Sequence, residues 1–328
     1  MDILITDFIT GISFGEVQVF KNLEMIPLFT AGEKGPVYLT LKEALEKRLL
    51  VVKEISVEAS VPELKVINNA AIPVLLLDGE ELAGAKQNRV LNTSILVKEK
   101  SEIIIPVSCT EQGRWSYKTD EFFDSDVILP SFLRAKKASS VNISLQEERS
   151  YRSDQQGVWE DVNFLREKAE VNSPTGAMKD VYEGKKEDLE EYMKAFQCLP
   201  HQKGIMVLVN GEIAGLDILS RESAFQMLFP KLVKSYTLDA ILEKEKKKES
   251  SQKPLEEAKS FLEAIKDCEE KKYPSAGQGL DYRFEGKDKV GSALVYDNTI
   301  IHMAFFKISK EEKIGRMSGY KKRREYRI

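Results

Sequence analysis

The chain has 328 residues, of which 42% are hydrophobic and 31% charged, and its formal net charge at pH 7 is −4. This composition is typical of a folded globular protein and excludes a disordered or collagen-like chain. The first residues, MDILITDFIT, carry acidic groups and no basic segment, and no run of about 18 apolar residues follows, so we expect neither a signal peptide nor a membrane span. Three separated cysteines without a C-x-x-C pair favour a reducing compartment, so the sequence predicts a cytoplasmic protein.

The first third of the chain predicts mainly strands. Alternating and apolar runs over 14–20 and 23–29 predict two of them, and TLKEALEKRLL predicts a helix in which Thr40 and Glu43 have capping-box spacing. Further strands are predicted in LVVKEISVE, ELKVINN, PVLLLD, TSILV and SEIIIPVSC. Pro106 lies inside the last segment and indicates an edge strand or a bulge, because proline lacks the N–H of a sheet hydrogen bond.

The middle of the chain predicts helices. One apolar stripe at helical spacing runs through 158–169, and DLEEYMKAFQCL carries another. After a hairpin over 205–218 that turns at Asn210-Gly211, helices resume at SRESAFQMLF and at PKLVKSYTLDAILEK, with Pro230 in the first turn of the latter. A further helical stripe over 255–265 precedes the last hairpin, GSALVYDNTIIHMAFF.

We therefore predict an α+β fold with mixed or largely antiparallel sheets. The sheets come from the N-terminal third, the 205–218 hairpin and the 281–306 hairpin, and they enclose a helical middle section. The predicted organisation is one large domain over 1–306, with a sub-boundary near 120–150 and a helical insert over 219–272. The polar run EKEKKKESSQKP resembles a linker.

Residues 307–328 form a predicted basic C-terminal tail. From Lys313 onward it carries seven Lys or Arg and one Glu, a net of +6, which leaves −10 for the rest of the chain. A basic segment can contact nucleic acid, but no RNA-binding motif or DNA-reading helix accompanies these charges. We therefore favour packing of the tail on the acidic body of the protein and expect no nucleic-acid partner.

Several familiar active sites are absent from the sequence. There is no G-x-x-x-x-G-K-[ST] phosphate loop, no G-x-G-x-x-G after a strand, no G-x-S-x-G elbow and no H-E-x-x-H pair. With two histidines in the chain we expect no Cys/His zinc site. Catalysis would have to use carboxylates, lysines, arginines, amides, one histidine or one thiol.

The first candidate segment is LDGEELAGAKQNRVLN, over 77–92. Asp78 and Glu80 directly follow an apolar strand, where sheets commonly present ligand-binding groups. The segment then has four consecutive residues with long polar side chains, which can bind a carboxylate, a phosphate or an amide: Lys86, Gln87, Asn88 and Arg89. The alternative is an exposed hairpin whose charges are only solvated.

The second candidate segment is SCTEQGRWSY. Strand alternation places Cys109 and Glu111 on one face, and a nearby cation would lower the pKa of a nucleophilic thiol. The alternative for Cys109 is a small core residue, which is the more common role. We favour a binding wall formed by Glu111, Gln112, Arg114 and Trp115.

The third candidate combines the loop YPSAGQGLDYRF with the last hairpin. Its glycines can expose backbone N–H groups to an anion, and Asp281 and Arg283 share one strand face. His302 lies in an otherwise apolar strand and is a candidate base, although a hydrogen-bonded core histidine is the more common case. A fourth polar cluster, RSDQQGVW, contributes Gln155 and Trp159.

These segments resemble a known family. LLLDGEELAGAKQNRVLNTSILV, IPVSCTEQGRW, Gln155–Trp159 and SAGQGLDYRFEG…GSALVYDNTIIHMAFF resemble the ADP-ribosylglycohydrolase- and rhodanese-phosphatase-associated protein domain family, most strongly over 74–117 and 273–306. The resemblance implies an association with ADP-ribose- and phosphate-handling domains and assigns no reaction. The recurring polar motif residues correspond here to Asp78, Gly79, Glu80, Gln87, Asn88, Arg89, Cys109, Glu111, Gln112, Arg114, Trp115, Gln155, Trp159, Arg283 and His302.

The sequence leaves three functional hypotheses open. The first is a small-molecule site for a nucleotide or ADP-ribose-like ligand, in which arginines bind phosphates, a tryptophan stacks on a base, and the catalytic candidates are Glu80, Glu111, His302 and Cys109. It requires the first two segments to lie on adjacent strands. The second is a non-catalytic interaction module that uses the helical half or the basic tail. The third, divalent-metal hydrolysis by Asp78, Glu80, Glu81 and Glu111, lacks ligand spacing. The sequence assigns no cofactor, metal or oligomeric state and does not decide whether the chain is an enzyme.

Overall fold

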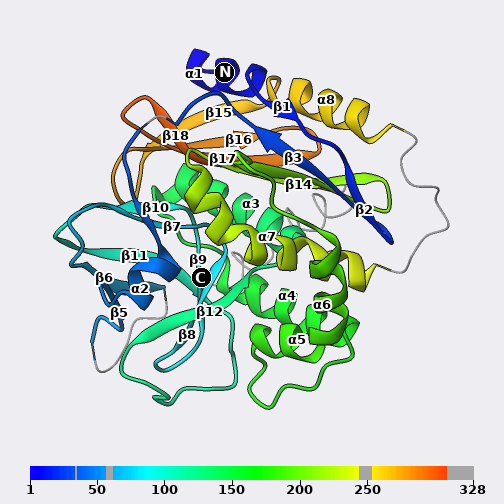
Figure 1. The fold of residues 1–328 in the computed structure, drawn as a ribbon. Coiled ribbons are helices and arrows are strands. Elements are labelled where there is room, and N and C mark those ends of the chain that lie inside the picture. Colours follow the sequence, from blue (N-terminus) through cyan, green and yellow to red (C-terminus); the bar gives the residue numbers. More distant parts are fainter. Residues whose placement is uncertain (34, 57–61, 244–252, 309–328) are drawn as a thin grey trace.

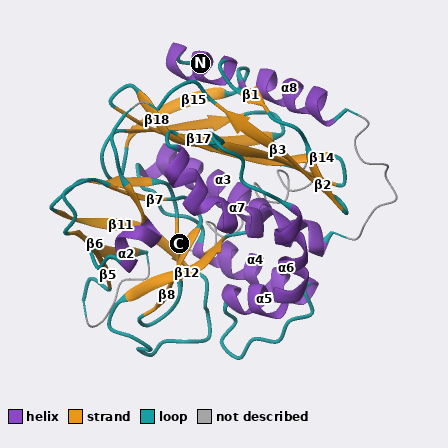
Figure 2. Ribbon diagram, viewed as in Figure 1, coloured by secondary structure: helices purple, strands orange, loops and turns teal. Residues whose placement is uncertain are grey.

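The computed structural model describes residues 1–33, 35–56, 62–243 and 253–308, and in this part the chain forms an α+β fold (Figure 1). A large antiparallel sheet occupies one half of the molecule, and smaller sheets and a group of helices occupy the other (Figure 2). The predicted fold class is confirmed. Residues 244–252 of the predicted linker EKEKKKESSQKP and residues 309–328 of the predicted basic tail lie outside the described residues.

The large sheet is assembled from both ends of the chain. Its order is β1-β3-β13-β14-β18-β17-β16-β15, with β2 paired to β3, and every pairing is antiparallel. The strands are β1 (Ser13–Phe14), β2 (Gln18–Phe20), β3 (Leu23–Phe29), β13 (Gly204–Val209), β14 (Glu212–Leu219), β15 (Glu269–Pro274), β16 (Leu280–Glu285), β17 (Lys289–Tyr296) and β18 (Thr299–Lys307).

Helices cover both faces of this sheet. Helices α1 (Ile3–Thr10) and α8 (Pro254–Ile265) lie on one face, and α3 (Ser131–Glu148) and α7 (Glu222–Leu242) lie on the other (Figures 1 and 2). Strand alternation explains the two cores: in β13, Ile205 and Val207 pack toward α3 and α7, whereas Met206 packs toward α1 and α8.

The other half contains two smaller sheets and the remaining helices. One sheet has the order β10-β7-β4 and the other β12-β8-β9-β11-β6-β5; the pairing of β4 with β7 is parallel. These strands are β4 (Leu39–Thr40), β5 (Leu50–Lys53), β6 (Glu63–Asn68), β7 (Val74–Leu76), β8 (Glu80–Gly84), β9 (Arg89–Leu91), β10 (Ile95–Val97), β11 (Ser101–Cys109) and β12 (Phe122–Ile128). The helices are α2 (Leu41–Glu46), α4 (Gln155–Lys168), α5 (Met178–Gly184) and α6 (Lys186–Ala195).

The predicted helix cap and the two predicted tight hairpin turns are confirmed. Thr40 and Glu43 form the predicted capping box at the start of α2. The Asn210-Gly211 turn joins β13 to β14 with φ values of 52° and 75°, and the Asp297-Asn298 turn joins β17 to β18 with φ values of 49° and 52°. These positive φ values are the ones that a tight two-residue hairpin turn demands.

Two predictions about prolines are wrong. β11 lies between β9 and β6 and is therefore an internal strand. Its pairing with β6 ends at Pro106 and its pairing with β9 begins at Val107, so the N–H that proline lacks lies where the partner strand changes. Pro230 lies inside one continuous helix, α7, and does not begin a second helix. Pro230 and Gln226, whose carbonyl loses its helical partner, are both exposed, so water can satisfy that carbonyl. The short helix α1 was not predicted.

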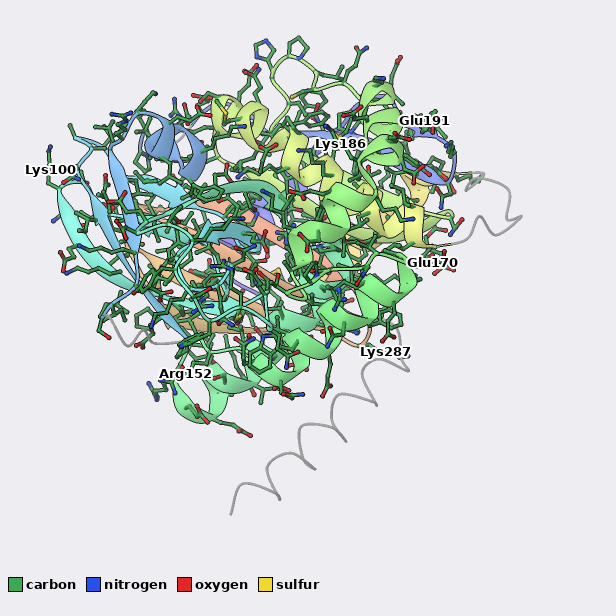
Figure 3. All side chains as sticks on the ribbon, turned by 90° about the horizontal axis from the view of Figure 1, so that it is seen from below. Lys100, Arg152, Glu170, Lys186, Glu191 and Lys287 are labelled. Atoms are coloured by element: carbon green, nitrogen blue, oxygen red, sulfur yellow. The ribbon has the colours of Figure 1, made fainter. Side chains whose placement is uncertain are left out.

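Charged side chains project from the surface in many directions, among them Lys100, Arg152, Glu170 and Lys287 (Figure 3). Within the described residues, no helix has both the length and the apolar character that crossing a membrane requires.

Candidate functional site

The two polar motif segments meet on neighbouring strands. β9 pairs antiparallel with β11, and Arg89 lies opposite Cys109. Beyond the paired residues, the Asn88 N–H donates to Glu111 Oε2 at 3.1 Å, and Gln87 Nε2 donates to the Glu111 carbonyl at 2.9 Å. This is the adjacency that the small-molecule hypothesis requires.

Glu111 and Arg114 form a two-point ion pair at this junction. Arg114 Nε donates to Glu111 Oε1 at 2.9 Å and Nη2 donates to Oε2 at 2.6 Å. Arg114 also donates to the carbonyls of Ala85 and Gly84, at 2.5 and 3.1 Å, and Thr175 Oγ1 donates to the Glu111 carboxylate at 2.8 Å. Burial opposes ionisation of Glu111, but these donors outweigh it and hold its pKa below the ordinary value.

An exposed aromatic pair lies next to this ion pair. Trp115 is 50% exposed and Tyr117 is 48% exposed, and the Lys86 ammonium lies 5.2 Å from the centroid of each ring. Gln112 is also exposed. We call these four residues the motif surface. Its rings can stack on a planar group, and its ammonium can bind an anion.

Beneath the motif surface, Cys109 is buried and held by amides. Gln155 of α4 receives the Cys109 N–H at 2.7 Å and donates to the Cys109 carbonyl at 2.9 Å, so one side chain joins α4 to β11. The thiol donates to Gln87 Oε1 at 3.2 Å, and the indole of Trp159 lies against it. Burial raises the pKa of the Cys109 thiol, which disfavours the thiolate that a nucleophile needs.

Arg89 lies below the same junction and is fully buried. Its Nη1 donates to Gln87 Oε1 at 2.9 Å, and its Nη2 lies 3.7 Å from Glu54 Oε1. In this arrangement the guanidinium braces the strands from inside, and solvent does not reach it.

A second group of motif residues lies at the centre of the protein, where the large sheet meets helix α3. The turn between β7 and β8 presents Asp78, and Gly79 takes a φ of +83° in a space closed by the Arg134 side chain. Arg134 donates to Asp78 at 3.3 Å and makes two hydrogen bonds to Asp217 of β14, at 2.8 and 2.7 Å. Lys137, one turn further along α3, pairs with the other oxygen of Asp78.

His302 joins this central cluster from β18. Its Nε2 lies 3.1 Å from Asp217 Oδ1, and its Nδ1 lies 2.8 Å from Ser94 Oγ, which accepts the Asp78 N–H. Tyr236 of α7 donates to Asp217 Oδ2 at 2.8 Å. We call Asp78, Arg134, Lys137, Asp217 and His302 the central ion cluster.

The charges of the central ion cluster are matched. Burial favours the neutral form of Asp217, but the ion pair with Arg134 outweighs it and lowers the pKa to about 2. Burial likewise opposes ionisation of Asp78, yet Lys137 and Arg134 hold its pKa below the ordinary value. Burial lowers the pKa of Lys137 to about 8, although Asp78 opposes that shift. The result is a set of paired charges in a low-dielectric interior, in which the pKa of Lys137 lies well below that of an ordinary lysine.

The third candidate segment extends this cluster. Arg283 Nη2 donates to Asp281 Oδ2 at 2.7 Å, and Thr93 Oγ1 donates to the same oxygen at 2.7 Å. The Arg283 guanidinium lies 5.5 Å from the centre of the Tyr151 ring. Arg283 and Asp281 are both buried, so the third segment is separate from the exposed motif surface. Residues 93–94, which directly follow the first segment, link it to the third through Asp281 and His302.

Glu80 and Glu81 point in different directions from β8 and join two further buried groups. Lys231 of α7 donates to Glu80 at 2.5 Å and to Asp124 at 2.8 Å. Burial and the nearby Asp124 raise the pKa of Glu80, because two carboxylates share one ammonium. Glu81 accepts from Thr110 Oγ1 at 2.7 Å, and burial raises its pKa to about 7.

These positions separate the carboxylates proposed for metal hydrolysis. Asp78 is paired with Arg134 and Lys137, Glu80 with Lys231, and Glu111 with Arg114. Among the residues that the structure describes, no group of three or more His, Cys, Asp or Glu could hold a metal ion.

The sequence analysis missed four buried charged residues. Arg134, Lys137 and Lys231 pair with the motif carboxylates Asp78 and Glu80, and Asp217 pairs with Arg134 and contacts His302. Two signals were available. Asp217 interrupts the apolar run GLDIL, and Arg134 and Lys137 lie three residues apart on the face of α3 that also carries Ala138.

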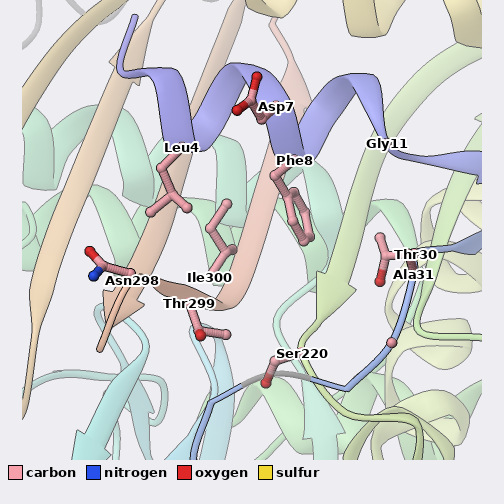
Figure 4. A pocket seen from close by; sticks show the side chains of 11 residues that line it. Leu4, Asp7, Phe8, Gly11, Thr30, Ala31, Ser220, Asn298, Thr299 and Ile300 are labelled. Carbon is pink, nitrogen blue, oxygen red and sulfur yellow. The ribbon is translucent and has the colours of Figure 1, made fainter.

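Two cavities in the described part of the chain lie elsewhere. One, of about 310 Å³, lies under α1, where Leu4 and Phe8 point toward Ile300 (Figure 4). The other, of about 550 Å³, lies between α3, α4, the end of α7 and the β13–β14 turn. None of the sequence-predicted site residues lines either cavity.

The fold and the site define an α+β protein whose polar motifs converge on a buried ionic interior and one exposed aromatic face. The model of the family described as "ARG and Rhodanese-Phosphatase-superfamily-associated Protein domain" (ARPP-1) matches residues 11–306, so the chain belongs to this family. This agrees with the resemblance seen in the motifs. No curated protein and no solved structure matched the chain.

Proposed function

We propose that this chain binds a nucleotide or ADP-ribose-like small molecule at the motif surface. The observation that carries the proposal is the position of the Lys86 ammonium, 5.2 Å from the centroids of two half-exposed rings, Trp115 and Tyr117. A base stacks on one of these rings, and the ammonium binds a phosphate as a point charge. Base–aromatic stacking contributes about 1–3 kcal/mol for each base.

The neighbouring polar residues support such a surface from below. The Glu111–Arg114 pair ties the strand ahead of Trp115 to the Gly84 and Ala85 carbonyls, which precede Lys86. The rings and the ammonium therefore stand on two segments that are fixed to each other before a ligand arrives. Prior ordering lowers the entropy cost of binding.

The motif arginines act as braces in this proposal. Arg114 donates to carbonyl oxygens and to Glu111, whereas Arg89 and Arg283 are buried on internal partners. We assign the phosphate contact to Lys86, because its ammonium lies beside both exposed rings. The family's association with the ARG and rhodanese-phosphatase superfamilies supports the ligand class but not a reaction.

A thermal-shift screen tests this function. The full chain is heated with ADP-ribose, NAD and a set of nucleotides, and a specific ligand raises the melting temperature by mass action. Trp115→Ala and Lys86→Ala should remove the shift. The matched control is Phe123→Ala, because Phe123 is also an exposed ring, with the Lys179 ammonium 6.0 Å from its centroid.

The outcomes separate the hypotheses. A shift that survives in the control and disappears in the two motif-surface variants supports the proposal. The absence of a shift with every nucleotide overturns it and favours the interaction-module hypothesis. Arg89→Ala is a poor test, because loss of a buried guanidinium disturbs the fold whatever the ligand.

A further inference from the structure

The cavity of about 550 Å³ is a candidate for a second ligand site, separate from the motif surface. It is lined by the first turn of α3, the last turns of α4 and α7, the β13–β14 hairpin and the end of β18. It shares no residue with the motif surface.

Two of the residues that line this cavity, Asp239 and Asn210, each hold a buried acceptor oxygen without a partner in the described part of the chain, and we call this pair the floor. Asp239 Oδ1 and Asn210 Oδ1 have no hydrogen-bond partner among the described residues, and both side chains belong to residues that are only 7% exposed. The rest of each group is engaged. Asp239 Oδ2 accepts from the Ser131 hydroxyl and the Phe132 N–H, and Asn210 Nδ2 donates to Glu243 Oε2 at 3.1 Å.

These contacts determine what the floor can bind. The Glu243 carboxylate fixes the amide of Asn210 with its nitrogen outward and its oxygen free for a donor. A buried oxygen without a partner costs about 1–3 kcal/mol, so a ligand N–H that reaches both oxygens removes this cost. Burial raises the pKa of Asp239 to about 7, and a cationic donor would favour its ionised form.

Whereas the floor favours a cationic donor, the rim of the cavity favours an acidic or apolar group. Lys168 and Lys307 are exposed there; Lys307 pairs with Glu212 at 3.8 Å, and the Lys168 ammonium lies 5.8 Å from the centroid of the Phe164 ring. Phe164 of α4 is 49% exposed, and the Lys136 ammonium of α3 lies 5.9 Å from its centroid and 5.8 Å from the centroid of Phe132. The rim therefore offers cations for an acidic group and an aromatic face for an apolar one.

We propose that this cavity binds a small zwitterion of the amino-acid type. Its ammonium group donates to Asp239 and Asn210 on the floor, its carboxylate faces Lys168, and its side chain packs on Phe164. No covalent step is involved, and the proposal does not depend on nucleotide binding at the motif surface.

Thermal-shift and calorimetric titrations of the full chain with each of the twenty common free amino acids test the proposal. For the tightest ligand, two analogues are titrated: one without the carboxylate and one without the amine. At least one amino acid should bind saturably, and each analogue should bind at least about tenfold more weakly, the loss of about 1.4 kcal/mol of binding free energy.

Variants locate the site. Asp239→Asn keeps an oxygen for Ser131 and removes the charge, and it should weaken binding at least about tenfold. If this variant does not fold, Lys168→Ala on the exposed rim serves instead; it should weaken the amino acid and leave the amine-only analogue unaffected. Lys259→Ala, an exposed lysine on α8, is the control and should bind like the unaltered chain. No binding by any amino acid, or equal binding by all variants, overturns the proposal.

Discussion

Arg134 and Asp217 form a two-point ion pair in which both side chains are fully excluded from solvent, with N–O distances of 2.8 and 2.7 Å. The pair joins helix α3 to strand β14, and Tyr236 and His302 contact the same carboxylate. Every oxygen of Asp217 is therefore engaged, and this one residue connects the large sheet to the helices that separate it from the smaller sheets.

Removing one partner of this pair should strongly destabilise the protein. Asp217→Asn leaves Arg134 as an under-compensated buried charge, which costs about 3–5 kcal/mol of unfolding free energy. Urea denaturation measures the change. The control is Lys186→Ala, because the Lys186–Glu190 ion pair is largely exposed and such pairs contribute about 0–1 kcal/mol. Equal effects of the two variants would show that the central pair has no special role in stability.

Gln155 should contribute to stability through its two hydrogen bonds to Cys109. Gln155→Ala leaves a partly buried backbone N–H and carbonyl without that partner and should lower the unfolding free energy by about 1–3 kcal/mol. The adjacent Gln156 is exposed and bonds Glu160 at 3.2 Å, so Gln156→Ala is a matched control with a change below about 0.5 kcal/mol. A Gln155→Ala variant as stable as the control would contradict the bracing role.

The buried Glu81 should make stability fall as the pH rises. Burial raises its pKa from 4.5 to about 7, so below pH 4.5 the carboxyl is protonated in both the folded and unfolded states. Between pH 4.5 and 7 the unfolded state loses its proton first, and stability is lost by about 3 kcal/mol. Glu81→Gln should make this part of the curve of unfolding free energy against pH less steep, leaving the contribution of Asp239, and exposed Glu187→Gln should not. An unchanged curve in Glu81→Gln would place the titration elsewhere.

The thiols should differ in reactivity. Cys109 and Cys268 are buried and Cys198 is partly exposed, and burial raises the thiol pKa at all three positions. Iodoacetamide should therefore modify Cys198 first, slowly, and Cys109 only on unfolding. Mass spectrometry of peptides from partly labelled native protein measures the order. Preferential labelling of Cys109 would restore the nucleophile hypothesis.

The parts of the fold that the sequence predicted are those with local causes. The α2 capping box and the two tight hairpins depend on neighbouring residues with special backbone or side-chain requirements. The large sheet pairs β3, near the start of the chain, with β13, nearly two-thirds of the way along it. Nothing local in either strand specifies that partner, so the strand order was not predictable.

The site was partly predictable for the same reason. Only residues 93–107 separate the first two motif segments, and this short connection favours their pairing through Arg89 and Cys109. The partners of Asp78 come from α3 and, through Arg134, from β14, far along the chain. The rule that buried charges need partners signals that such residues exist, but the fold decides which ones they are.

Fluorescence of Trp115 tests the proposed ligand surface most directly. The chain has two tryptophans, so Trp159→Phe leaves Trp115 as the only one. Titration of this variant with ADP-ribose should quench the emission saturably, because a stacked base changes the surroundings of a ring that is now 50% exposed. Adding Lys86→Ala should weaken that binding at least about tenfold. Emission that stays constant up to millimolar ADP-ribose, AMP and NAD would contradict a nucleotide-binding motif surface.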